Sequence, residues 1–404
     1  MADRRKLGVL AAMLLFLIMA GAAFFVIKSY VWSSGSEEVP AAPPPAAPTA
    51  ATEPAAPAGG QANAADIYLR AAALIKFDCP ASSNDTYPEY PPFGNAWETR
   101  EQQGWEQNRP ARDLARQAAA IDTATWPRGG DVKFLNPLRA LANELGDAAL
   151  YEHEHGHDAE AVDSVRDILH MADLLDTNPH LALVSNLVGE GCTALAMYRL
   201  MIISSNVAIA ADGQQSDALP VASAKELIAR LLDQPDAETR MAHILKLEGV
   251  PGPDLAAILK DPRFTRATET FRRVNAGRTF AAMSLASHLF YFEQKRWPNS
   301  ARELASLLPG GLPRDTWGDG KQTFGYVLIK GGLPDGSDRP LVYDRCNSAD
   351  GMFFRVDQPE YGFYLGYGSN PPGAQQKQGG EFNDVASWVP AAKVPGAPTT
   401  RPLP

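Results

Sequence analysis

The chain has 404 residues and a formal net charge of -10, with 47 acidic residues against 37 Lys and Arg. The basic residues are scattered and build no basic stripe, which argues against nucleic acid as a partner. Three widely separated cysteines, Cys79, Cys192 and Cys346, form no C-x-x-C pair, so neither a zinc ribbon nor a dithiol redox motif is expected. Cys192 lies in an apolar helical run and is expected in the core, and disulfide pairing is left open.

An uncharged apolar run at residues 7–27 is long enough to cross a bilayer, because about 21 helical residues span roughly 31 Å. Basic residues at 4–6 precede it and only Lys28 follows, so the positive-inside rule places residues 1–6 in the cytoplasm. We therefore expect a single-pass signal anchor in the cell inner membrane, with the bulk of the chain periplasmic or extracellular. The alternative is a cleaved signal peptide with a small-residue site at 20–22.

Residues 33–63 consist mainly of Ala, Pro, Ser, Thr and Glu, with too little apolar bulk to offset the entropy of ordering. They are expected to form a disordered tether. A Pro-rich spacer of this length reaches roughly 90–100 Å when extended. The Pro-rich residues 390–404 are expected to form a second disordered tail.

Helical periodicity dominates residues 64–250, and no fixed repeat length emerges. Helices that follow one another through short turns imply antiparallel hairpins, so this part is expected to be an all-helical domain. The expected helices span residues 63–75, 109–121, 136–154, 158–175, 180–203, 222–232 and 237–247.

Residues 262–389 are expected to form a small α+β domain. A long helix at 264–292, with a flaw at 275–277, precedes a short helix at 301–308. Four short runs of high β propensity follow and predict a small antiparallel sheet packed on the long helix. These runs lie at residues 323–329, 340–343, 352–356 and 361–367. The expected fold class is therefore mainly α, a helical-hairpin array followed by this domain.

The segment His153-Glu154-His155-Gly156-His157 contains H-E-x-x-H, the signature of zinc metallopeptidases. Such a site needs both outer histidines on one face of a continuous helix, with the Glu between them as base. Projection of the preceding helix places His153 and His157 far from its apolar stripe, so both are expected to point to solvent. Gly156 followed by Asp158 fits a helix end and a new start, so we predict a tight turn at 156–157.

That turn would remove His157 from the helix and leave no zinc site. The best third ligand along the chain is Glu190, in an ordinary helical context. Three close histidines would also bind nickel or zinc weakly, whatever the biology. No nucleophile elbow, phosphate-binding loop or EF-hand is present, so no catalytic, cofactor-binding or metal-ligating residues and no cofactor are predicted.

The C-terminal part resembles the major pseudopilin of type II secretion systems. The segments that carry the resemblance are Phe290-Tyr-Phe292, Arg296-Trp-Pro-Asn-Ser-Ala-Arg-Glu-Leu304, Leu312-Pro-Arg-Asp-Thr-Trp-Gly318 and Gly379-Gly-Glu-Phe-Asn-Asp-Val-Ala-Ser-Trp388. The resemblance covers about a quarter of the chain and implies a long helix packed on a small sheet. The family binds calcium in its sheet region, but only Asp384 matches an acidic position, which leaves calcium binding open.

Departures from the pseudopilin family are also clear. A pseudopilin starts with a Gly cleavage site, a methylated Phe and a nearby Glu, whereas here Gly8 is followed by Val9 and the apolar run contains no acid. The whole chain is similar to a group of membrane-anchored bacterial envelope proteins without an assigned activity.

We therefore expect a membrane-anchored extracytoplasmic protein that is not an enzyme and that binds or scaffolds other envelope proteins. One alternative is a membrane-anchored zinc metallopeptidase that uses His153, Glu154 and His157. A second alternative is an accessory component of a secretion or pilus-like system.

Overall fold

The computed structural model describes eleven stretches of the chain, all within one compact unit. The predicted membrane span at 7–27, residues 33–61 of the tether predicted at 33–63, and the tail at 390–404 lie outside them, as do Cys79 and Cys346. The described residues are 62–76, 95–127, 132–176, 182–204, 206–214, 216–247, 262–315, 322–329, 338–343, 352–355 and 364–365.

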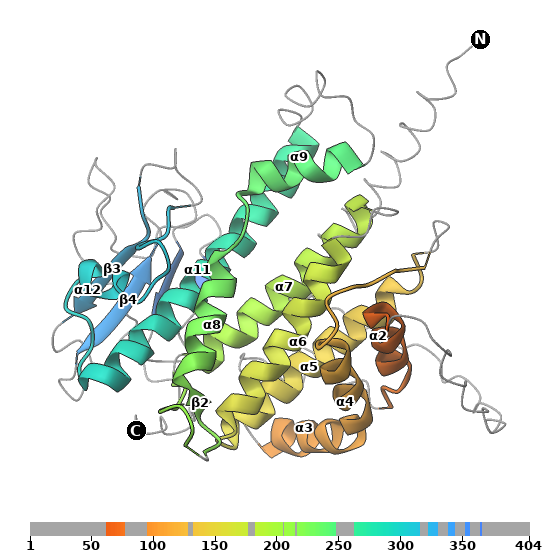
Figure 1. The fold of residues 1–404 in the computed structure, drawn as a ribbon, viewed down its shortest axis with the longest axis horizontal. Helices are drawn as coiled ribbons and strands as arrows, with labels where there is room; N and C mark the ends of the chain where they lie inside the picture. Colours follow the sequence, from red (N-terminus) through yellow and green to blue (C-terminus); the bar gives the residue numbers. More distant parts are fainter. Residues whose placement is uncertain are drawn as a thin grey trace, which may run out of the picture. The chain divides into compact units, whose positions relative to one another are not determined.

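The described part is mainly helical, as expected (Figure 1). Most of the helices begin and end within a few residues of the predicted bounds. The helices are α2 (Ala64–Ala73), α3 (Asn95–Gln107), α4 (Arg109–Ala118), α5 (Leu135–Glu154), α6 (Asp158–Asp176), α7 (Ala182–Ser204), α8 (Val221–Leu232), α9 (Ala237–Leu247), α11 (Pro262–Gln294) and α12 (Ala301–Ala305).

The core of the bundle lies where α5, α6, α7 and α11 pack against one another. On α5 the residues at three- and four-residue steps, Leu138, Leu141 and Leu145, are fully buried. Helix α7 is the one described helix long and apolar enough, by length and composition, to cross a membrane. Its apolar window is 67% buried within the bundle, and its Arg199 donates to Asp147 of α5 at 2.6 Å. These contacts are those of a central core helix.

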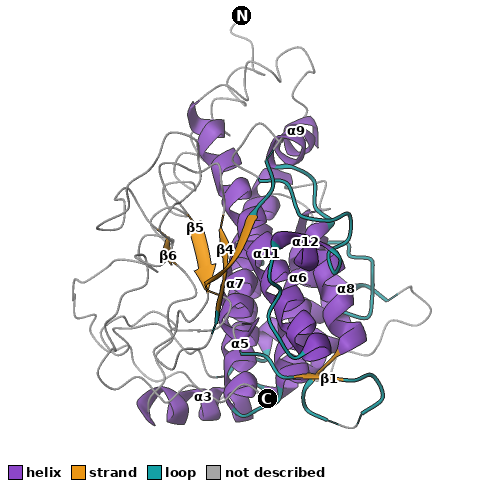
Figure 2. Cartoon of the chain, turned by 90° about the vertical axis from the view of Figure 1, so that its left-hand side faces the viewer, coloured by secondary structure: helices purple, strands orange, loops and turns teal. Residues whose placement is uncertain are grey.

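Two small sheets accompany the helices. Strands β3 (Gly325–Ile329), β4 (Arg339–Tyr343), β5 (Met352–Arg355) and β6 (Tyr364–Leu365) pair antiparallel in that order. Strand β4 also contacts α11, beside which it lies in Figure 2. The sequence did not predict the second sheet, in which β1 (Ile209–Ala210) and β2 (Leu219–Pro220) pair in parallel.

One prediction about helices was wrong, and one helix was not predicted at all. Helix α11 runs unbroken through residues 275–277, where a flaw was expected. Asn275 donates to the Pro235 carbonyl at 3.1 Å, and a Cβ on Gly277 would lie 3.5 Å from Met197 Cβ, so both residues face neighbours without interrupting the helix. Helix α3 was missed because its sequence is strongly polar, and its position is fixed by tertiary contacts such as those of Trp97, which is 5% exposed.

Candidate functional site

The histidine-rich segment forms the predicted turn. Helix α5 ends at Glu154, Gly156 has a φ of 85°, and α6 begins at Asp158. A left-handed backbone at the residue after the helix cap is most easily adopted by glycine. The Gly156 and His157 amides donate to carbonyls of the last turn of α5, at 3.0 and 2.8 Å. The prediction that the chain reverses at this glycine is confirmed.

The expected exposure of His153 is wrong, because this side chain is 1% exposed. Its Nδ1 pairs with Asp158 Oδ1, and its Nε2 lies 2.7 Å from Asn206 Oδ1. The other Asp158 oxygen accepts the Ala208 amide at 2.8 Å. Helical projection failed here because the segment after α7 packs over the turn and covers a face that α5 alone would leave in water.

The other histidines of the segment lie outside the core. His155 Nε2 is 2.9 Å from Glu98 on α3, and its Nδ1 is 2.7 Å from the Tyr151 carbonyl. His157 retains 44% of its side-chain surface and lies 3.4 Å from Asp217. The two outer histidines of the motif therefore do not share a helix face. Among the described residues, no group of three or more His, Cys, Asp or Glu side chains is arranged to hold a metal ion.

Glu190, the expected third ligand, lies in a different place. It is buried on α7 and pairs with Arg240 of α9. Arg240 also pairs with Asp176 at the end of α6, so one guanidinium joins carboxylates from two helices. Arg278 of α11 is 2% exposed and donates to Thr193 of α7 at 3.2 Å. We name Asp173, Asp176, Glu190, Arg240 and Arg278 the ion cluster.

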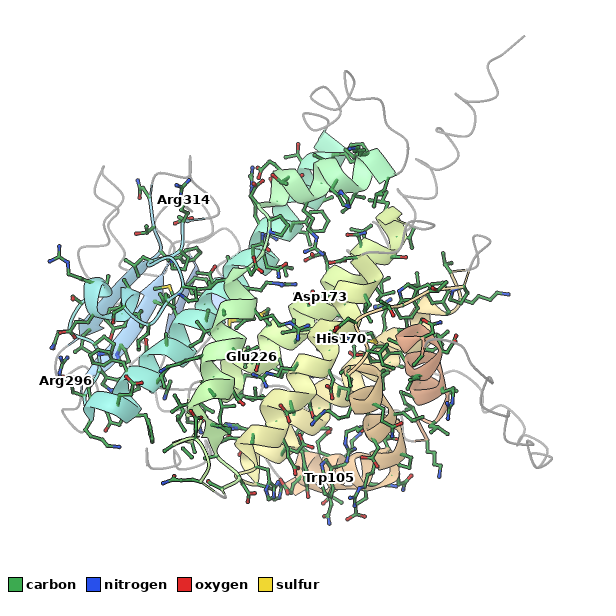
Figure 3. All side chains as sticks on the ribbon, in the orientation of Figure 1. Trp105, His170, Asp173, Glu226, Arg296 and Arg314 are labelled. Atoms are coloured by element: carbon green, nitrogen blue, oxygen red, sulfur yellow. The ribbon has the colours of Figure 1, made fainter. Side chains whose placement is uncertain are left out.

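The outer edge of the ion cluster reaches the surface at Asp173, one turn along α6 from His170 (Figure 3). Asp173 Oδ2 accepts a 2.8 Å bond from Arg230 of α8, and its Oδ1 lies 3.9 Å from Arg278. The guanidinium of Arg240 also lies over the Phe271 ring, 5.2 Å from its centroid. The ion cluster therefore connects α6, α7, α8, α9 and α11.

Several polar atoms in the ion cluster are buried without a hydrogen-bond partner among the described residues. They are Asp176 Oδ1, Glu190 Oε2 and Arg278 Nε. Burial, with smaller contributions from the nearby carboxylates of Glu190 and Asp173, raises the pKa of Asp176 to about 8 against the lowering effect of Arg240. Burial likewise raises the pKa of Glu190, opposed chiefly by Arg240 and then by Arg278. A buried carboxylate is costly unless it is paired and its oxygens receive hydrogen bonds.

Glycine makes the close approach of α6 and α7 possible at this point. A Cβ at Gly189 would lie 2.7 Å from Asp176 Oδ1 and 3.1 Å from the Ala172 carbonyl, which no side chain tolerates without movement. The Asn186 side chain donates to the Asp176 carbonyl at 3.2 Å, in the same contact. The local sequence Gly189-Glu190-Gly191 thus places a carboxylate where two helices nearly touch.

A second set of buried charges joins α4 to α5. Glu144 accepts from Asn108 at 2.7 Å and from Arg112 at 3.2 Å. Burial raises its pKa to about 7, against the lowering effect of these two donors. On α5, Glu152 accepts from Trp105 at 3.2 Å and from Ser164 at 3.0 Å. Trp105 lies on α3 (Figure 3), and Arg112 covers one face of its ring.

The buried charges are thus engaged with one another across helix contacts. Sequence reasoning missed the ion cluster because its members are spread over more than a hundred residues and each looks like a surface residue. The one local signal was Glu190 within an otherwise apolar helix. Cys192, predicted to be a core residue, is indeed buried, and burial raises its thiol pKa to about 12.

Comparison with known proteins adds no relative from which an activity could be transferred. No protein-family model, curated protein sequence or solved structure matches the chain significantly.

Proposed function

We propose that the protein is a membrane-anchored extracytoplasmic protein that binds or scaffolds other envelope proteins. The proposal rests on the surroundings of the three side chains that look most suited to catalysis or metal binding. His153, Glu190 and Asp176 are held by other side chains inside a helical bundle, in contacts that join helices. Because these side chains are used to hold helices together, they favour a rigid bundle whose surface binds other proteins.

The start of the described chain supports a tethered arrangement. Asn63, where the expected tether ends, donates to the Thr125 carbonyl at 3.1 Å and accepts the Thr125 amide at 2.8 Å. Its side-chain oxygen also accepts from the Ala65 amide at 3.3 Å, as the N-cap of α2. A chain leaving a membrane anchor would therefore be attached to the bundle at the first residues that the structure describes.

We also propose a division of the described part into two regions. Helices α2 to α9 form an array of helical hairpins, and α11 with the β3–β6 sheet forms a small α+β domain that resembles a pseudopilin. A shared ancestor of that kind would favour the second alternative, an accessory role in a secretion or pilus-like machine. No described contact favours the zinc metallopeptidase.

Membrane topology tests the anchor. Alkaline phosphatase and green fluorescent protein, fused separately after residue 404 in Gram-negative cells, should give phosphatase activity and little fluorescence. Deletion of residues 7–27 should release the protein from the membrane fraction and abolish the phosphatase signal. Strong fluorescence with an inactive phosphatase would overturn the extracytoplasmic placement.

The binding role needs a separate measurement. Chemical cross-linking of intact cells, followed by purification from detergent extracts, should recover envelope proteins in a fixed stoichiometry. The presence of secretion-system subunits would favour the accessory role, and their absence would count against it. Zinc bound at one equivalent per chain, and lost in His153→Ala, would contradict the non-enzymatic assignment.

A further inference from the structure

Helix α3 carries a row of polar side chains on a face that is exposed to solvent. Glu98, Gln102 and Glu106 follow one another at steps of four residues, so they lie on one side of the helix. The Gln102 amide donates to Glu106 at 3.1 Å, across one turn. Another side of α3, with the buried Trp97, packs against α5 and α4. The exposed face therefore presents two carboxylates with an amide between them.

Three aromatic rings lie beside this row, where α3 meets the end of α5. The Trp105 ring, at the edge of the helices in Figure 3, lies 5.6 Å from the Tyr151 ring, measured between centroids. The Tyr151 ring lies 4.1 Å from the ring of His155. Trp105 and Tyr151 are partly exposed, and His155 is exposed. We name these rings and the polar row the acidic aromatic patch, which consists of Glu98, Gln102, Trp105, Glu106, Tyr151 and His155.

The two carboxylates of the acidic aromatic patch are accessible to a partner. Glu98 pairs with His155 at 2.9 Å and keeps 43% of its side-chain surface exposed. Glu106 is exposed and accepts from Gln102, and no cation in the described part of the chain pairs with it. Burial raises the pKa of the Tyr151 phenol, and Glu98 and Glu106 raise it further. The negative potential of both carboxylates therefore extends over the aromatic rings.

A guanidinium of the bundle already lies against one ring of the patch. Arg112 is 5.2 Å from the centroid of the Trp105 ring, and its side chain is 10% exposed and pairs with the buried Glu144. Because it is held below the surface by Glu144, Arg112 does not neutralise the two exposed carboxylates. Its contact is of the kind that an aromatic face favours, since the electrons of the ring attract a cation. The charge of the patch thus complements a positively charged partner.

We propose that the acidic aromatic patch is the docking surface for a partner protein, which binds it through an exposed segment that carries arginine side chains. A guanidinium suits both parts of the patch, because it stacks on aromatic rings and forms paired hydrogen bonds with a carboxylate. Two arginines spaced roughly 12 Å apart would reach Glu98 and Glu106, which are eight helical residues apart. This inference rests on the proposed binding role and names the chemistry of the partner.

Titration of the full chain with a synthetic peptide tests this surface. The protein is labelled with 5-fluorotryptophan, and the fluorine resonance of Trp105 is assigned by its loss in Trp105→Phe. The probe is an alanine peptide with arginine at every fourth position, and the control peptide has glutamine at those positions. At low ionic strength the arginine peptide should shift the Trp105 resonance to saturation, and added salt should weaken the binding. An unshifted Trp105 resonance, or equal binding of the two peptides, would overturn the proposal.

Two double variants locate the binding. Glu98→Gln with Glu106→Gln removes both charges of the patch and keeps the size of the side chains. An exposed ion pair contributes up to about fivefold in affinity, so this variant should bind the arginine peptide about fivefold to twentyfold more weakly. The matched control is Glu226→Gln with Glu238→Gln, on α8 and α9, where the two side chains are 77% and 48% exposed. Its affinity should change less than twofold. Equal affinities of the two variants would assign the binding to the overall charge and overturn the proposal.

Cross-linking in intact cells separates this proposal from the binding role itself. The parent protein and the control variant on α8 and α9 should recover the same envelope proteins, and the variant of the acidic aromatic patch should lose them. Equal recovery with all three proteins would overturn the docking surface and leave the binding role intact. If the parent protein recovers no envelope protein, both proposals are wrong.

Discussion

The buried imidazole at the α5–α6 turn provides a sharp test of how the bundle is held together. His153→Ala removes a side chain that joins three parts of the chain: the end of α5, Asp158 at the start of α6, and Asn206 after α7. The matched control is His157→Ala, four residues along the same segment, where the side chain is half exposed and its neighbour Asp217 is 74% exposed. Both changes delete the same atoms from the same motif.

The expected cost follows from what is left behind. Removal of the imidazole takes one partner away from the buried Asp158 carboxylate, at about 1–3 kcal/mol for a polar group and more for a charged one. A cavity in a closely packed turn adds to this. The Ala208 amide still bonds to Asp158 and limits the damage. We expect His153→Ala to lower the free energy of unfolding by about 2–4 kcal/mol, whereas an exposed ion pair such as that of His157 contributes only about 0–1 kcal/mol.

Urea unfolding of the purified full-length chain at pH 7.5, followed by far-UV circular dichroism, measures both variants. The midpoint should fall for His153→Ala with little change in slope, and His157→Ala should overlie the parent protein. Equal effects of the two substitutions, or less than about 0.5 kcal/mol for His153→Ala, would refute a structural role for the buried imidazole. Addition of a strong chelator should change neither curve, because we assign the segment no metal.

Three further predictions concern stability. Since the folded-state pKa of Glu144 is raised to about 7, its contribution is complete below about pH 4.5 and is lost as pH rises through 7, so the unfolding free energy should fall between pH 5 and pH 8. In Glu144→Gln, the loss of unfolding free energy between pH 5 and pH 8 should be smaller by up to about 3 kcal/mol, as measured by urea unfolding at each pH. The same loss in the variant and the parent protein would contradict this. Asn63→Ala should lower the free energy of unfolding by about 1–2 kcal/mol and speed proteolysis within α2, because Thr125 loses both of its hydrogen bonds to that side chain. Unchanged resistance to proteolysis would count against this attachment of α2. Gly156→Ala should destabilise the protein by about 1 kcal/mol, because Gly156 has a positive φ. Gly191→Ala should stabilise it by up to about 1 kcal/mol, because an added Cβ meets nothing within 4 Å there. Thermal unfolding measures both variants, and the opposite order of stability would refute the backbone argument.

The local features of this fold were readable from the sequence, and the turn at Gly156 shows why. A helix end is encoded by a few adjacent residues, because glycine alone adopts the left-handed conformation at little cost. On α5, Leu138, Leu141 and Leu145 recur at three- and four-residue steps in the sequence, and all three are buried. By contrast, the sequence of α3 is polar, and the helix is held by its buried Trp97 and by Trp105, which donates to Glu152 of α5.

The environments of individual polar residues could not be predicted in this way. His153 faces outward on an isolated helix, and only the segment after α7 encloses it. Glu190 looked like a possible metal ligand until Arg240, fifty residues further along the chain, was found beside it. Neither position carries a local signal for its partner, because the pairing depends on how several helices pack. Those tertiary contacts also determine the charge state of the carboxyls.

The distribution of buried charge suggests how the helices find their places. The α5–α6–α7 contacts are largely apolar, and apolar faces tolerate more than one register when side chains are of similar size. Around α9 the contact instead contains Arg240, which pairs with carboxylates of α6 and α7 in a single register. Replacement of a buried ion pair by apolar residues often leaves stability unchanged or raises it. We infer that these ion pairs determine the position of α9 on the bundle more than they stabilise the bundle. A triple variant with Arg240→Met, Asp176→Leu and Glu190→Leu should therefore keep the fold, while α9 no longer has a single position. If hydrogen-exchange protection of α9 is the same in the triple variant as in the parent protein, apolar packing alone is enough to fix the position of α9.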